Sequence, residues 1–399
     1  MNEINLKDKT HKEKHQNTHL PALTGIRFFA IFYIFLHHLW ALYNHHSGKT
    51  EATQDLLIGL KDFPETLLVI MSNGWISTSL FFMLSGFILA YMYWGEDGQF
   101  TISKRRFWLL RFARLYPVHL LVLLILIAFK FPTYLDENVP IELVVSSAIG
   151  SSLLIQAWVP AWIPMWSWPT WTISVMIFLY LIMPYIITVL SRLSRRQLII
   201  TLMAMPILSI LPAVVFAIMM ALGITWNMNT ELFFNNFPLF WVPYFVAGIL
   251  ITRIFSLNKF SKIQQTSSLL AWGDFAFIIV IVIACTPDIM QPMQLFIRQG
   301  LLMPLYIVFI LDLACGKGIM AKMFTLPGTQ FLGETGFSIF IWQSVIMTAV
   351  FVSLEYFPEI GPYQFWLAII LLLAVSIPST YLFEKPLARL IRIKYIDIK

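Results

Sequence analysis

Long apolar segments recur along this 399-residue sequence and limit the folds that it can adopt. A helix that crosses a bilayer needs about 20 largely apolar residues. Segments of roughly this length occupy residues 20–43, 71–94, 107–130, 171–190, 197–222, 237–251, 269–286, 295–315, 331–352 and 363–383. The sequence therefore predicts an all-α, polytopic membrane helical bundle with about ten transmembrane helices.

Composition supports a surface that faces the lipid bilayer. Hydrophobic residues make up 58% of the chain and charged residues only 12%, whereas soluble domains carry about 25% charged residues. The net charge of +6 is not accompanied by a basic helix or an RNA-binding motif, so we predict no nucleic-acid partner. The two cysteines, Cys285 and Cys315, lie inside apolar segments, which argues against a disulfide framework. We also predict no metal site.

The distribution of Lys and Arg predicts the orientation, because these residues concentrate in cytoplasmic loops. The Lys-containing tail 1–19 starts in the cytosol, and 20–399 then forms a single transmembrane domain. An eleventh apolar segment, 141–158, has a Ser- and Gly-rich centre. If it spanned the membrane, later basic clusters would fall outside; if it lies in the interface or re-enters, they fall inside. We therefore expect ten spans, both termini cytosolic, with Arg298 as the one awkward charge.

The first predicted span contains Arg27, His37 and His38. Eleven residues separate Arg27 from His38, which is close to three helical turns, so the two side chains share a face about 16 Å apart along the axis. His37 points roughly 80° away from that line. Histidine suits general-base catalysis because its pKa lies near physiological pH. The alternative is that Arg27 snorkels to the inner interface and both histidines sit among headgroups; alignment within one apolar helix favours function.

Arginines cluster at the predicted cytosolic start of the third span. They are Arg105, Arg106, Arg111 and Arg114. Arg111 and Arg114 are three residues apart and so share a helix face, and guanidinium groups bind phosphates well. Positive-inside topology alone explains such a cluster, but Arg114 lies deeper than topology requires.

Other polar residues within the predicted spans are weaker candidates. Ser174 is an additional candidate, although serines in membrane helices more often make packing contacts than act as nucleophiles. Glu384 is another, and an interfacial ion pair with the adjacent Lys385 would also explain it. The remaining ones are Ser85, Asp274, Asp312, Glu334 and Gln343.

Several motifs together resemble the acyltransferase-3 family of integral membrane acyltransferases. The first is LTGIRFFA at 23–30, whose Arg27 lies eleven positions before His38, a hallmark spacing of that family. The others follow in order over nearly the whole chain: FFMLSGF at 81–87, the paired arginines within 107–117, WTISV at 171–175, the segment 332–340, and FEKP at 383–386.

The resemblance implies an enzyme of a bacterial cytoplasmic membrane that takes an acyl group, commonly acetyl, from cytosolic acyl-CoA. It implies transfer to a hydroxyl of an extracytoplasmic carbohydrate or lipid-linked glycan. By the resemblance, His38 is the catalytic base. Arg27, Arg111 and Arg114 position the donor and its phosphates. Arg106, in the same basic cluster, is a further candidate for binding the donor.

Two positions depart from the family pattern. The residue after 171–175 is Met176 where the family usually has glutamate, and the residue after Trp342 is Gln343 where many members have histidine. Met176 cannot carry a proton, which keeps a catalytically divergent relative as an alternative. A transporter of an anionic small molecule is a further alternative, but it should show weak inverted repeats and paired broken helices, and the sequence contains none.

Overall fold

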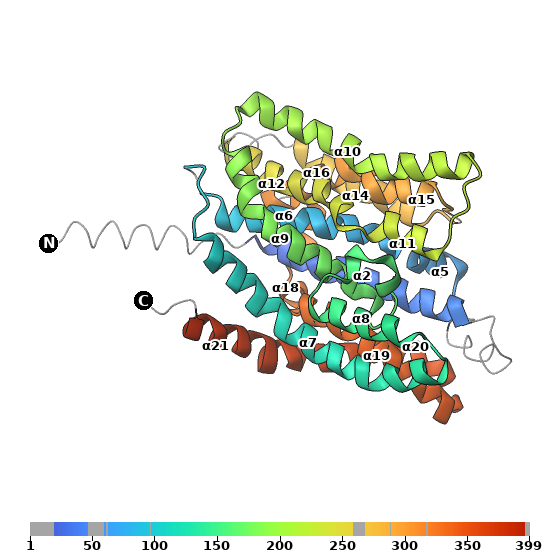
Figure 1. Ribbon diagram of the computed structural model, residues 1–399. Coiled ribbons are helices and arrows are strands. Elements are labelled where there is room, and N and C mark those ends of the chain that lie inside the picture. Colours follow the sequence, from blue (N-terminus) through green and yellow to red (C-terminus); the bar gives the residue numbers. More distant parts are fainter. Residues whose placement is uncertain are drawn as a thin grey trace.

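Helices form every regular element of the part of the chain that the computed structural model describes (Figure 1). That part comprises residues 20–46, 60, 63–95, 97–257, 268–287, 289–316 and 318–395. Outside the helices, Trp94 and Phe100 form an isolated antiparallel bridge. The predicted polar tail 1–19 lies outside the described residues.

The first half of the bundle begins with the helix that carries Arg27 and His38. In chain order its helices are α2 (Pro21–His46), α5 (Glu65–Ser72), η1 (Gly74–Ile76), α6 (Ser77–Tyr93), α7 (Lys104–Asp136), α8 (Ile141–Ser152), η2 (Gln156–Trp158), η3 (Pro160–Trp162), η4 (Trp168–Thr170), α9 (Trp171–Leu190) and α10 (Arg195–Ala221). Two of the long helices, α7 and α10, have N-terminal residues whose side chains cap the helix. Ser103 accepts the Arg106 amide at the start of α7, and Ser194 forms a capping box with Gln197 before α10.

The second half contains shorter and more broken helices. They are α11 (Met228–Asn236), η5 (Pro238–Trp241), α12 (Val242–Leu257), α14 (Ser268–Ala284), α15 (Met293–Phe296), η6 (Ile297–Leu301), α16 (Met303–Cys315), α17 (Ile319–Phe324), α18 (Pro327–Glu334), α19 (Gly336–Tyr356), η7 (Pro358–Tyr363), α20 (Gln364–Pro378), η8 (Ser379–Glu384) and α21 (Lys385–Tyr395). The π-helical segment η8 joins α20 to α21.

Among the described residues, eight helical segments are long and apolar enough to cross a membrane, and a bent pair would make a ninth. The bent pair, Met293–Leu301 with Met303–Cys315, turns by 42° and corresponds to the predicted span 295–315. The predicted span 269–286 coincides with α14, whose 17 residues rise about 26 Å, close to the thickness of a bilayer core. The prediction of an all-α polytopic bundle is confirmed.

Segment 141–158 forms the short helix α8 and the single turn η2. The 12 residues of α8 rise about 18 Å, well below the roughly 30 Å of a bilayer core. This length agrees with the expectation that the segment does not span the membrane. α8 packs instead along α7, and both helices lie together at one side of the bundle in Figure 1.

The boundaries of several predicted spans differ from the structure; the sixth, for example, begins at Met228 rather than 237. The second helical span begins at Glu65 rather than 71, because α5 and η1 continue into α6. The last one continues past 383 to Lys394. The continuation α21 is an amphipathic helix rather than an apolar one. Its basic face carries residues spaced by three and four positions, namely Lys385, Arg389 and Arg392.

Two large hydrophobic clusters build the interior. One is formed mainly by α6, α9, α12 and α16, and the other mainly by α2, α7, α19 and α20. Outer helices present apolar side chains away from these clusters: on α10, Met203 is 68% exposed and Ile207 is 67% exposed. Large apolar side chains that are exposed on a long helix indicate a lipid-facing surface.

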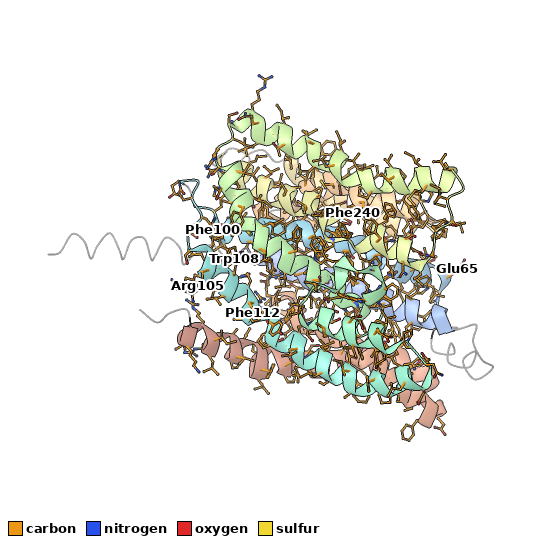
Figure 2. The ribbon with its side chains drawn as sticks, in the orientation of Figure 1. Glu65, Phe100, Arg105, Trp108, Phe112 and Phe240 are labelled. Atoms are coloured by element: carbon orange, nitrogen blue, oxygen red, sulfur yellow. The ribbon has the colours of Figure 1, made fainter. Side chains whose placement is uncertain are left out.

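The two ends of the bundle differ in charge. Figure 2 shows Arg105, in the first turn of α7, at the end opposite Glu65 in α5. The end with Arg105 also holds the start of α2 and helix α21. We call this end, with the first turn of α7 and the whole of α21, the basic end.

Candidate functional site

Two neighbouring cavities lie near the basic end, and Arg27 and Arg114 line both. The deeper one, the inner cavity, has a volume of about 110 Å³. It lies between the two hydrophobic clusters and is lined by side chains of α2, α6, α7, α9 and α19. Its apolar wall includes Ile31, Phe81 and Phe340, and its polar lining consists of Arg27, Ser85, Arg111, Arg114, Thr172 and Tyr180.

The second cavity, the basic vestibule, has a volume of about 470 Å³ and opens at the basic end. Five cationic side chains line it with two carboxylates; they are Arg27, Arg114, Lys385, Arg389 and Arg392, with Glu334 and Glu384. The excess of positive charge creates a potential that attracts an anion such as a phosphate group. Three of the five cations come from α21, and the sequence analysis did not single these out as ligand-binding residues.

Ion pairs connect α21 and its preceding turn to the rest of the vestibule. Glu384 is 5% exposed, and one of its oxygens lies 3.6 Å from Nε of Arg114. Ser338 on α19 donates to its other oxygen at 2.9 Å. Lys385 pairs with Glu334 at 2.6 Å. The suggested Glu384–Lys385 pair is therefore wrong, because each residue has a partner on another helix.

Close backbone contacts hold α2 against α17 and α18 beside both cavities. A Cβ atom on Gly333 would lie 2.1 Å from the carbonyl oxygen of Thr24, and one on Gly25 would lie 2.0 Å from that of Phe324. Only residues without a Cβ permit such an approach. Since Gly333 lines both cavities, this contact places the N-terminal turns of α2, and hence Arg27, at the junction between them.

Arg111 lies on the side of the inner cavity formed by α6 and α7. Its terminal nitrogen donates to the hydroxyl of Tyr93 at 2.7 Å. Its guanidinium also lies 5.4 Å from the ring centroid of Tyr93 and 5.8 Å from that of Phe107. The buried Nε atom has no hydrogen-bond partner among the described residues. Arg111 is therefore fixed in position yet keeps a donor available.

His38 lies beyond the inner cavity on α2, one of the helices that line it. Its Nδ1 atom is 3.0 Å from Oε1 of Gln343 on α19. Ile31 of α2 and Phe340 of α19 line the cavity, and His38 and Gln343 follow them by two turns and one turn, respectively. Going along α2, the order is therefore Arg27 at the basic vestibule, then the inner cavity, then His38.

His37 has a different environment. Its ring stacks on Trp40, with centroids 6.0 Å apart and planes at 22°. A Cβ atom on Gly74 would lie 2.7 Å from the Cβ of His37, so this side of α2 packs against η1. The two histidine rings are 5.7 Å apart. His37 packs in an aromatic contact, whereas His38 pairs with a polar side chain.

The other predicted candidates are not all close to the cavities. Ser174 is 1% exposed, and its hydroxyl accepts the Ala157 amide at 3.3 Å, which ties the loop before α9 to that helix. Arg106 is exposed in the first turn of α7 and lines neither cavity.

Met176 does line the inner cavity. Tyr180, one turn after Met176, lines it too and was not singled out from the sequence. No metal-binding cluster occurs among the described residues.

Arg298, the exception to the predicted charge distribution, lies against aromatic rings inside the protein, and its Nε atom has no hydrogen-bond partner among the described residues. Its guanidinium lies 5.5 Å from the ring of Trp171 and 5.4 Å from that of Trp241, and it donates to Asn235 at 2.9 Å. The faces of aromatic rings and an amide oxygen stabilise a cation that is removed from water.

Comparison with known proteins agrees with this arrangement. A family described as an acyltransferase domain matches residues 20–385. The chain is also 31% identical over 181 residues to a protein named acyltransferase MdmB from Streptomyces mycarofaciens. That match covers 45% of this chain and 42% of the relative, so less than half of the relative's length is spanned. No solved structure matches the chain.

Proposed function

The chain belongs to the acyltransferase-3 family, and from this premise we propose that it is a membrane O-acyltransferase. The donor is a cytosolic acyl-CoA, with acetyl as the transferred group, and the acceptor is a hydroxyl of an extracytoplasmic or lipid-linked carbohydrate. The protein acts in a bacterial cytoplasmic membrane, with both termini and the basic end in the cytosol.

The observation that carries the proposal is the order of chemical groups along α2. The basic vestibule suits the phosphates of the donor, because arginine and lysine bind phosphate oxygens through charge-assisted hydrogen bonds. The inner cavity has an apolar wall beside its three guanidinium groups, and this wall suits the uncharged pantetheine arm and a short acyl chain. His38 follows on the side away from the basic end. A donor that enters from the cytosol would thus present its thioester toward a general base.

The reaction follows from these roles. His38 takes the proton of the acceptor hydroxyl while the hydroxyl oxygen attacks the thioester carbonyl carbon. The carbon–sulfur bond then breaks, and the proton passes from the imidazolium to the sulfur that leaves as CoA thiol. The products are an acyl ester of the acceptor and free CoA. No step requires a carboxylate at position 176, so Met176 is compatible with this reaction.

Family membership favours an enzyme over the transporter considered from the sequence. The test is deletion of the gene, followed by complementation with wild type or with His38→Ala, and measurement of ester-linked acetyl groups on surface carbohydrate. Loss of these esters in the deletion strain, restored only by wild type, supports the proposal. Unchanged acetylation in the deletion strain contradicts it, and restoration by His38→Ala contradicts the role of His38.

A further inference from the structure

Gln343 makes two hydrogen bonds that together determine the state of His38. Its Nε2 donates to the carbonyl oxygen of Phe340 at 2.7 Å, and its Oε1 lies 3.0 Å from Nδ1 of His38. The residue is fully buried. It lies on α19 one turn after Phe340, which lines the inner cavity.

The first of these bonds fixes the orientation of the amide. A backbone carbonyl can only accept a hydrogen bond, so the amide group that faces Phe340 must be the NH₂. The oxygen of the amide then has to face His38. The flipped amide would place two oxygen acceptors against each other at Phe340, and is therefore disfavoured.

The orientation of the amide fixes the tautomer of the histidine. Because Oε1 is an acceptor, Nδ1 of a neutral His38 must carry the hydrogen. The lone pair then resides on Nε2, which is the nitrogen that can accept a proton from an acceptor hydroxyl. A histidine whose Nδ1 had no such partner would divide its population between two tautomers, and only one of these would have its basic nitrogen at Nε2.

We propose that Gln343 is a positioning residue that holds His38 in the Nδ1-protonated tautomer and in the orientation needed for proton transfer. This inference rests on the proposed function, since it assumes that His38 is the base. Gln343 acts only through His38: it lines neither cavity, and both ends of its amide are engaged.

An amide differs from a carboxylate in one measurable respect. A carboxylate beside Nδ1 would favour the protonated imidazolium by charge, whereas glutamine is uncharged at every pH. Gln343→Glu retains an acceptor for Nδ1 but adds this charge. The activity of Gln343→Glu should therefore be lost at a higher pH than that of wild type as the pH falls.

The experiment measures transfer from [¹⁴C]acetyl-CoA to endogenous acceptors in membrane vesicles of the deletion strain that express each full-length variant. Gln343→Leu removes the amide at similar size. We expect its kcat to fall about 10- to 100-fold, the usual effect of losing a partner that orients a functional histidine, with an unchanged KM for acetyl-CoA. The matched control is Gln364→Leu. Gln364 is also a buried glutamine that donates to a backbone carbonyl, that of Val350, but it lies on α20 and lines neither cavity.

The outcomes separate the inference from the function on which it rests. Wild-type kcat in Gln343→Leu, together with an inactive His38→Ala, overturns the inference and leaves the proposed function standing. Active His38→Ala overturns the base assignment itself. If Gln343→Leu does not fold, Gln343→Glu decides: an acid limb at the wild-type pH overturns the inference, and an acid limb moved to higher pH supports it.

Discussion

Replacing Gly333 with alanine tests whether the α2–α18 contact positions Arg27. The added Cβ would lie 2.1 Å from the Thr24 carbonyl oxygen, whereas Cβ atoms in proteins stay beyond 3.0 Å from such atoms. One backbone must therefore move by about 0.9 Å or more. Displacements near 1 Å in a reacting complex can cost about 100-fold in rate.

We expect Gly333→Ala to lower kcat/KM for acetyl-CoA by about 10- to 100-fold, measured in the vesicle assay with protein content matched by immunoblot. The control is Gly328→Ala in the same helix, where the added Cβ would meet nothing within 4 Å. This change should leave activity near wild type. Wild-type activity in Gly333→Ala, or an equal loss in both variants, would refute the argument that this contact sets the geometry of the cavities.

Three further predictions concern the cavities and the loop before α9. Arg389→Glu should raise the KM for acetyl-CoA about two- to fivefold at low salt, a modest effect because exposed charges each contribute little. The control Arg196→Glu, which changes an exposed cation at the start of α10 that lines neither cavity, should leave the KM unchanged. Equal KM values for the two variants would argue against a role for Arg389 of α21 in donor binding. Met176→Ala should enlarge the inner cavity and raise the ratio of the rate with butyryl-CoA to the rate with acetyl-CoA about tenfold. The control Met183→Ala changes a methionine that is buried two turns away and lies outside the cavity, and it should leave this ratio unchanged. An unchanged ratio in both variants would mean that Met176 does not limit the length of the acyl chain. Ser174→Ala should keep its activity and lose about 1–3 kcal/mol of stability, because the Ala157 amide loses its acceptor. The loss is measured as a lower thermal midpoint in detergent. Loss of activity in a stable protein would instead show that Ser174 takes part in the chemistry.

Much of the fold follows from the sequence because length and hydropathy are local properties. The helical segments could be located from apolar runs, and the positions of the basic clusters indicated that segment 141–158 would not span. The ends of the helices were harder to predict from the sequence. The extension of the last span through Lys385 and Arg389 depends on packing of α21 against α7, which hydropathy does not register.

The site was predictable where one helix carries it. Helical geometry predicts that Arg27 and His38 share a face, and the resemblance pointed to Arg111 and Arg114. Contacts between distant segments were not accessible in this way. Gln343 is 305 residues from His38, and in the sequence it appeared only as a departure from the family pattern. Likewise, Glu384 seemed to pair with its neighbour Lys385 because the position of Arg114 is set by the tertiary fold.

The account depends most directly on the assignment of the base to His38 rather than His37. The measurement that tests it compares His38→Ala with His37→Ala in the vesicle assay, scored as hydroxylamine-releasable [¹⁴C]acetyl per expressed protein. We predict that His38→Ala loses about 100- to 10,000-fold in rate, the range expected for a general base, and that His37→Ala stays within about tenfold of wild type. An active His38→Ala, or a loss confined to His37→Ala, would contradict the account.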